Sequence, residues 1–401
     1  MILNVKGRQG LLWCLAIMMS MAFNTSSYAS EWSGFSAVEY RYFLHPSSNN
    51  SISQHNPSAV ISPEFYHQWD EGDQSIIIAP FLRVDSEDSS RSHADLREAM
   101  WLIADDDWEL RLGVGKVYWG VTESQHLVDV INQTDWIENP DNEEKLGQPM
   151  INLSLFEQWG TLDLFVLPYF RERNFPGQMG RLRSQLVVDT DNATYKSAKE
   201  RQHIDLAIRW SHSTGDWDLG LSHFYGTNRE PLFTPNQQFT VLNPYYDLMN
   251  QTGLEVQRTT GAWLWKLESI RRETSVDTFT AVTGGFEYTY YNIFESGLDV
   301  GLISEYLFDD RNNELIAPFE DDVLVGTRIT WNDEQSTELL IGVIQDVDSN
   351  DAAWSIEASR RIGNRWKLSV EGRLFKVDQI NNVFYQIRND DYLQAELARY
   401  F

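Results

Sequence analysis

Apolar and polar residues alternate along most of the chain after residue 30, and this alternation predicts β-strands rather than helices. Successive side chains of a strand point to opposite faces, so a period of two marks a sheet with one apolar face. The pattern gives about 18 candidate strands, with 16 as the alternative count. The candidates are 34–44, 60–69, 75–84, 94–104, 108–118, 150–157, 161–170, 203–213, 216–226, 248–258, 262–272, 276–290, 295–308, 322–331, 337–346, 352–362, 365–377 and 391–401.

The connections between these candidates alternate between short polar turns and long loops. Short turns are DEGD at Asp70, DDD at Asp105, TGD at Thr214, TTG at Thr259, NDEQ at Asn332 and GN at Gly363. Long connections include 45–59, 119–149, 171–202, 227–247, 309–321 and 378–390. Short turns at one end and long loops at the other are typical of an antiparallel up-and-down transmembrane β-barrel, with periplasmic turns and outer loops. The predicted fold class is therefore all-β.

Tryptophan placement supports a membrane barrel. Eight tryptophans stand beside the proposed short turns: Trp69, Trp108, Trp159, Trp210, Trp217, Trp263, Trp331 and Trp366. An amphipathic indole ring prefers the membrane–water interface, so a row of them at one strand end predicts an aromatic girdle. The alternative is a soluble β-protein with core tryptophans, which would lie at strand centres instead.

The first 29 residues have the features of a secretory signal peptide, with Lys6 and Arg8 before an apolar stretch at 11–23 and with Ser27 and Ala29 before the expected cleavage site. An uncleaved anchor helix is the alternative. The mature chain, 30–401, is then predicted to be a single barrel domain. Cys14 is the only cysteine, so the mature chain has no disulfide framework.

Charge and apolar content narrow the class further. Without Lys6 and Arg8, 30 basic residues stand against 59 acidic ones, a net charge near −29, which excludes nucleic acid as a partner. After residue 30 no apolar run approaches the roughly 18 residues of a membrane helix. A chain that spans a membrane without such helices must close into a barrel, because every backbone polar group needs a partner there.

The insert 119–149 is the longest early stretch that does not follow the strand pattern. Leu127, Val128, Val130 and Ile131 form an apolar cluster, which predicts one or two short helical turns. Long inserts in compact domains are usually functional or disordered, and the cluster argues against disorder. We predict that the insert folds into the lumen and narrows a pore, whereas the alternative is an outer lid or receptor surface. The constriction candidates are Asp129 and Asp135 first, and then Glu138, Asp141, Glu143 and Glu144.

Basic residues on the polar faces of the strands predict the wall opposite this insert. A charge facing lipid costs a few kcal/mol at the bilayer midplane, so these side chains should point inward. Gly113 and Gly115 would leave room for the insert against the wall. Salt-bridged filling of the barrel is the alternative role for the basic residues. The predicted wall residues are Arg41, Arg111, Arg209, Arg328, Lys367 and Arg373.

The last strand ends in DYLQAELARYF, with Leu393, Leu397 and Phe401 on one face. It resembles the terminal strand of Gram-negative outer-membrane proteins, whose last aromatic residue is read by the barrel-assembly machinery. Arg399 departs from that pattern, which prefers an aromatic or apolar residue there. A basic side chain can still reach the interface by extending along the apolar surface.

The whole mature chain resembles porins in architecture. The strings WGVTESQHLVDVINQTD and GLSHFYGTNREP resemble an uncharacterised group of bacterial outer-membrane proteins. General porins carry a constriction loop between their fifth and sixth strands, where the insert lies here. The resemblance implies the bacterial outer membrane, contacts with lipid and lipopolysaccharide, and assembly by the barrel-assembly machinery. It is also compatible with a homo-oligomer.

These features together predict a channel for passive diffusion of small polar solutes or ions, weakly cation-preferring because of the acidic residues. No catalysis, cofactor or metal is predicted. A receptor or adhesin without transport is one alternative, and a barrel-embedded hydrolase is another. The hydrolase is disfavoured because no G-x-S-x-G motif is present; the nearest stretch, Gly220 to His223, lacks the closing glycine.

Overall fold

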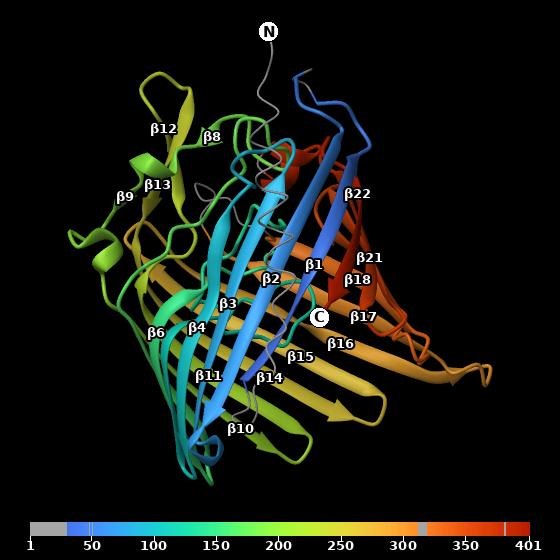
Figure 1. Cartoon of the computed structure of the whole chain (residues 1–401). Helices are drawn as coiled ribbons and strands as arrows, with labels where there is room; N and C mark the ends of the chain where they lie inside the picture. Colours follow the sequence, from blue (N-terminus) through green and yellow to red (C-terminus); the bar gives the residue numbers. More distant parts are fainter. Residues whose placement is uncertain (1–29, 48, 50, 312–318, 381) are drawn as a thin grey trace.

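The computed structural model describes residues 30–47, 49, 51–311, 319–380 and 382–401, so the predicted signal peptide lies outside the described residues. Within them, eighteen strands form one antiparallel sheet that closes on itself (Figure 1). Each strand pairs with its neighbours along the chain, and β22 pairs with β1. The strands are β1 Ser30–Phe43, β2 His55–Trp69, β3 Gln74–Asp85, β4 Ala94–Asp105, β5 Trp108–Gly115, β6 Gln148–Glu157, β7 Gly160–Leu167, β10 Asp205–Thr214, β11 Trp217–Thr227, β14 Leu248–Thr260, β15 Trp263–Thr274, β16 Thr278–Ile293, β17 Leu298–Asp309, β18 Asp321–Thr330, β19 Glu338–Asp346, β20 Ala352–Ile362, β21 Trp366–Lys376 and β22 Tyr392–Tyr400.

The predicted closed barrel and the count of 18 are confirmed, and the alternative count of 16 is wrong. Each predicted window overlaps one barrel strand, and most boundaries differ by only a few residues. The end of β5 is one exception that matters. The strand ends at Gly115 rather than at residue 118, because the chain leaves the sheet there to begin the insert.

The two faces of the barrel have the reverse of the polarity expected for a soluble protein. On β1, the side chains of Val38 and Tyr40 are 60% and 45% exposed, whereas Glu39 and Arg41 are 5% and 4% exposed. On β3 the buried Arg83 and Asp85 alternate with the exposed Leu82 and Val84 in the same way. The outer face therefore suits lipid, and the interior holds the polar side chains.

The girdle tryptophans lie on this exposed surface. Trp217, Trp263, Trp331 and Trp366 are all exposed beside short turns, so the alternative of core tryptophans is wrong. Trp263 stacks on Trp265 with ring centroids 5.3 Å apart. The guanidinium of Arg399 lies 5.8 Å from the ring centroid of Trp366, and this contact accommodates the basic residue at a position that favours aromatic ones.

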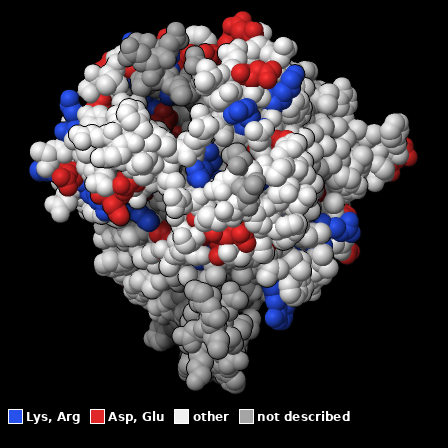
Figure 2. Space-filling view, turned by 90° about the horizontal axis from the view of Figure 1, so that it is seen from above, with Lys and Arg blue, Asp and Glu red and all other residues white. Residues whose placement is uncertain are grey.

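The long loops gather at one end of the barrel, with exceptions to strict alternation. The β15–β16 connection lies at the long-loop end but spans only 275–277. A small second sheet, which the sequence did not predict, lies beyond the strand ends there (Figure 1). Its strands are β8 Val187–Val188, β9 Thr194–Tyr195, β12 Leu232–Pro235 and β13 Val241–Tyr246. Figure 2 views this end and shows acidic and basic side chains gathered in several mixed groups.

Helical structure in the described part of the chain is limited to four short 3-10 turns. They are η1 Asp70–Gly72, η2 Thr190–Asn192, η3 Glu200–Gln202 and η4 Val383–Ile387. Over these same residues, no helix has the length and apolar character needed to cross a membrane.

Candidate functional site: the segment between β5 and β6

Residues 116–147 connect β5 to β6 and correspond closely to the predicted insert. The predicted helical turns at the apolar cluster are wrong, because the stretch forms only turns and bends. A wall carboxylate binds the backbone just before the cluster and at Val128 within it. The N–H groups of Val121, Thr122 and Val128 donate to Glu268 on β15, at 2.6, 2.9 and 3.2 Å. Backbone donors held in this way are not available for a regular helix.

Two further wall carboxylates hold the first part of the segment. The backbone N–H groups of Glu123 and Ser124 donate to Glu305 on β17, at 2.7 and 2.8 Å. The N–H of Gly120 donates to Glu255 on β14 at 3.1 Å. Ionised carboxylates that accept backbone N–H groups make strong hydrogen bonds. This part of the segment is therefore fastened along β14, β15 and β17.

The apolar cluster packs against the inner wall. Val128, Val130 and Ile131 are buried in one core together with side chains of β4, β6, β7, β11 and β14. The wall residues of this core include Met100, Met150, Phe165, Phe224 and Met249. The amide of Asn132 adds a polar contact, since its Nδ2 donates to the carbonyl of Gly115 at 2.9 Å. A Cβ at Gly115 would meet Met100 and Met150, and one at Gly113 would meet the Ala99 backbone, so the space at these glycines is taken by wall atoms rather than by the segment.

Ion pairs hold the second part of the segment to a different set of strands. The Arg83 guanidinium on β3 binds Glu138 at 2.7 Å and Glu39 on β1 at 3.1 Å. Arg41 and Arg91 both donate to the carbonyl oxygen of Glu138, each at 3.3 Å. All of these side chains are buried, so their charges interact in a partly desolvated interior.

The six acidic residues that were predicted to line a constriction differ in their surroundings. Asp135 and Glu138 are buried and paired, Asp135 with Arg97 and Glu138 with Arg83. The Asp129 side chain is 8% exposed and pairs with Lys145, while Asp141 pairs with Arg373 at 3.3 Å and Glu143 with His126 at 3.6 Å. Glu138, Asp141 and Glu144 line a cavity, whereas Asp129 and Asp135, the two candidates ranked first, are engaged in ion pairs.

The six predicted wall residues differ in whether they contact the segment. Four of them contact the segment: Arg41 and Arg373 as described, Arg328 through Glu123 at 2.8 Å, and Arg209 through the Trp119 ring at 5.8 Å. Arg111 pairs with Glu109 on its own strand at 2.5 Å. Lys367 borders the same cavity as Glu144.

The sequence analysis missed the residues that hold the segment most closely. Arg83, Arg91 and Arg97 were not singled out, and neither were the wall carboxylates Glu255, Glu268 and Glu305. The alternation of apolar and polar residues along the strands could have identified some of these residues as pointing inward. Arg83, for example, lies between Leu82 and Val84, both of which are exposed.

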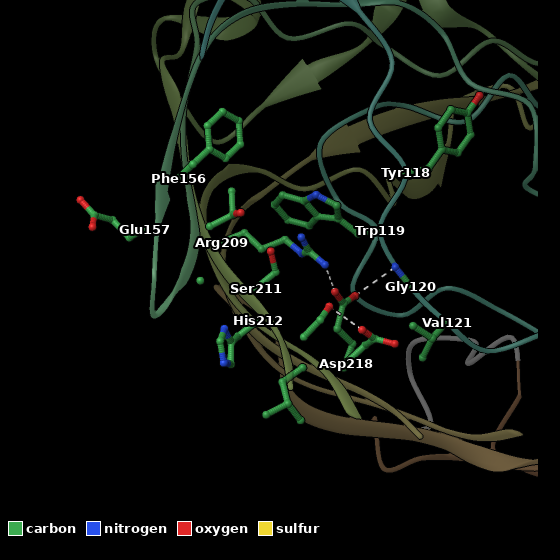
Figure 3. Close-up of a pocket in the computed structure, with 15 residues that line it drawn as sticks. Tyr118, Trp119, Gly120, Val121, Phe156, Glu157, Arg209, Ser211, His212 and Asp218 are labelled. Carbon is green, nitrogen blue, oxygen red and sulfur yellow. Dashed lines mark hydrogen bonds and ion pairs between the residues drawn. The ribbon is translucent and has the colours of Figure 1, made fainter. Parts of the chain in front are cut away.

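Two cavities lie beside the segment. One has a volume of about 370 Å³ and is lined by the segment and by β1, β3 and β18 to β22. Eight carboxylates and three basic groups line it: Glu39, Glu138, Asp141, Glu144, Glu338, Glu357, Glu371 and Glu396 against Arg83, Arg328 and Lys367. The other, of about 330 Å³, is shown in Figure 3, where dashed lines join Arg209 and Gly120 to a shared carboxylate, that of Glu255.

The pKa values of the segment follow from its contacts. Burial would raise the pKa of Asp135, but His93 and Arg97 hold it below its usual value. Glu143 and Glu268 raise the pKa of His126 to about 10, so this imidazole is charged at neutral pH. Burial, with Glu371 nearby, raises the pKa of Asp141 to about 7. Asp141 is therefore a group in the segment that titrates near neutral pH.

His93, Asp135 and Glu138 bring three possible metal-ligating atoms together. Their carboxylates are already engaged, because Asp135 accepts from Arg97 and Asn174 while Glu138 accepts from Arg83. The positive charges of Arg83 and Arg97, which are already bound to these carboxylates, repel a metal cation at the same place. The group therefore forms part of the ion-pair network that positions the segment.

A closed eighteen-stranded barrel with an apolar exterior, a polar interior and a long segment between its fifth and sixth strands has the fold of porin-type outer-membrane β-barrels. The chain matches OccK9 (OpdG) of Pseudomonas aeruginosa at 11% identity and a TM-score of 0.53, and OccK8 (OprE) of the same organism at 13% and 0.52. Each match covers 93% of this chain and 98% of the other. At such identities the likeness shows the fold alone. No protein-family model and no curated protein matches the chain.

Proposed function

We propose that the protein is a channel of the bacterial outer membrane through which small polar solutes or ions diffuse passively, with a weak preference for cations. The observation that carries the proposal is the cavity lined by eight carboxylates and three basic groups inside a closed barrel. Its apolar outer face fits lipid, and its polar interior fits hydrated solutes. No catalytic reaction is part of the proposal.

The segment 116–147 serves as the constriction in this proposal. Its first part is bound to Glu255, Glu268 and Glu305 on β14, β15 and β17. Its second part is bound to Arg83 on β3 and to Arg373 on β21. Contacts with such widely separated strands support a segment that crosses the lumen and leaves narrower paths beside it.

The expected cation preference comes from carboxylates that lack a basic partner. Within the described residues, Glu144, Glu338 and Glu396 have no basic group within 4.0 Å, yet all three line the larger cavity. In a narrow and partly desolvated path, charges act with several times their strength in bulk water. A net negative wall of this kind favours cations over anions.

The test is the conductance and reversal potential of the purified protein in a planar bilayer under a salt gradient. Glu144→Gln, Glu338→Gln and Glu396→Gln combined should shift the reversal potential toward that of an unselective pore. A matched control removes three charges from exposed turns, at Glu71, Asp216 and Glu334. An unchanged potential in the cavity variant would contradict the selectivity, and no conductance at all would contradict the channel.

A second candidate function, an outer receptor or adhesin without transport, is favoured by the small sheet beyond the barrel. Its strands β12 and β13 form a hairpin, and Phe239 in the turn between them is largely exposed. Large exposed apolar groups often mark contact surfaces. Absence of conductance together with loss of surface binding on deletion of this hairpin would favour this candidate.

A further inference from the structure

The β16–β17 hairpin extends past its neighbours at the short-turn end of the barrel (Figure 1). At 16 residues, β16 is the longest strand. The β14–β15 turn ends level with Thr289, whose N–H donates to the carbonyl of Ala262 at 3.0 Å. Beyond this level, residues 290–298 of the hairpin have no partner strand from β15.

The outward face of this extension continues the aromatic girdle. Tyr288 packs on Trp263 and on Tyr290, with ring centroids 4.6 and 4.7 Å apart. Ile293 pairs with Leu298 farther along. At the tip the side chain of Phe294 is 96% exposed. Exposed aromatic and apolar side chains therefore recur along the hairpin from the girdle to its tip.

The tip has an unusual residue for its backbone conformation. Phe294 and Glu295 have φ angles of +55° and +56°, a left-handed region that a bulky side chain rarely adopts. In the β2–β3 turn the same region is occupied by Asp70 and Glu71, and other short turns use glycine there, as at Gly215, Gly261 and Gly363. A bulky aromatic residue is thus held at a strained and solvent-exposed position, which suggests a function.

Several polar groups of the tip are bonded within the hairpin, and the Gly297 carbonyl accepts from the Asn332 side chain of the β18–β19 turn at 2.9 Å. The Asn292 side chain accepts from the N–H of Gly297 at 2.8 Å, and the Ser296 hydroxyl donates to the carbonyl of Ile293 at 2.6 Å. The N–H of Glu295 donates to the carbonyl of Asn292 at 3.0 Å. Entry of the tip into a less polar medium would therefore leave few hydrogen bonds unmade.

We propose that the tip of the β16–β17 hairpin is a lipid anchor, whose Phe294 inserts into the interface of the periplasm-facing leaflet beside the barrel. The proposal rests on the membrane location in the proposed function. The occupant is lipid because the exposed aromatic side chains of the hairpin begin at the girdle, the surface that already faces the membrane interface. Glu295 has the carboxylate nearest to the tip, and its exposed position lets it remain in the headgroup layer.

Spin labelling tests the anchor directly, because the chain has no cysteine after Cys14. The label is placed at Phe294→Cys, and the protein is reconstituted in vesicles of phosphatidylethanolamine and phosphatidylglycerol. Collision rates with oxygen and with a water-soluble nickel complex report the depth of the label. Leu254→Cys, on the outer face of β14, is the lipid reference, and Asn364→Cys, in the β20–β21 turn, is the aqueous reference.

The label at position 294 should be several-fold more accessible to oxygen, relative to the nickel complex, than the label at position 364. The proposal would be overturned if the accessibility to oxygen relative to the nickel complex were the same at position 294 as at position 364 while the label at position 254 reports lipid. If position 254 is also aqueous, the membrane location fails, and the anchor fails with it. Shielding of position 294 from both reagents would point to a protein partner and would also overturn the proposal. Tyr291→Cys, on the same tip, is the second site if Phe294→Cys does not fold.

Discussion

Replacing Ile131 by alanine should release the interior segment without opening the barrel. The Ile131 side chain is 0% exposed and lies in the core that joins the segment to the wall. The barrel itself is held by continuous strand pairing from β1 through β22, which does not involve this residue. The cost of the substitution should therefore fall on attachment of the segment rather than on the global fold.

The size of the effect follows from the burial. Truncating a fully buried isoleucine to alanine costs about 2–5 kcal/mol, from lost apolar transfer and from the cavity left behind. Since about 1.4 kcal/mol is a factor of ten, the ratio of detached to attached segment should rise roughly 30-fold to several thousand-fold. The ion pairs of Glu138 and Asp141 stay in place, so detachment should begin in the apolar part.

Single-channel recording and limited proteolysis check this prediction. The Ile131→Ala channel should show more frequent conductance fluctuations, and residues 119–134 should be cleaved faster. Ile208→Ala is the matched control, because Ile208 is an exposed residue on the outer face of β10. If the two variants have the same noise and the same cleavage rate, the apolar core does not hold the segment, and the reasoning is refuted.

Deleting Phe401 should lower the yield of heat-modifiable folded barrel on a gel, because β22 closes the sheet on β1 and the Phe401 N–H donates to Gly34. Cation preference should increase as the pH rises through about 7, because burial raises the pKa of Asp141 to about 7 and its deprotonation adds negative charge beside the cavity; reversal potentials between acidic and alkaline pH measure this. Asp129→Asn should destabilise the fold of the segment by about 3–5 kcal/mol, seen as faster proteolysis, because it leaves Lys145 of the same segment without its buried partner.

Each of these three outcomes has a control. Arg399→Tyr should leave the folded yield unchanged or raise it, and normal yield without Phe401 would contradict the role of the last residue. Asp141→Asn should flatten the pH dependence, and a step that persists would assign it to another group. Asp216→Asn, at an exposed turn, should not change proteolysis; if Asp129→Asn behaves in the same way, the buried pair does not hold the segment.

The strands could be predicted from the sequence because their pattern is local. Val38 and Tyr40 face outward while Glu39 and Arg41 face inward, and a period of two leaves few other arrangements. Polar turns and girdle tryptophans then marked the strand ends. The small outer sheet was missed because β8 and β9 have two residues each, too few for any period to be visible.

The contacts of the interior segment were decided by the tertiary structure. Its acidic composition indicated basic partners, but alternation alone does not say which inward residues lie opposite one another across a closed barrel. Arg83 meets Glu138, 55 positions away, only because β3 and the segment come together when the sheet closes. The same closure buries Asp135 and leaves Glu144 beside the cavity. Short-range pattern thus determined the barrel, and long-range closure determined which charges face its open space.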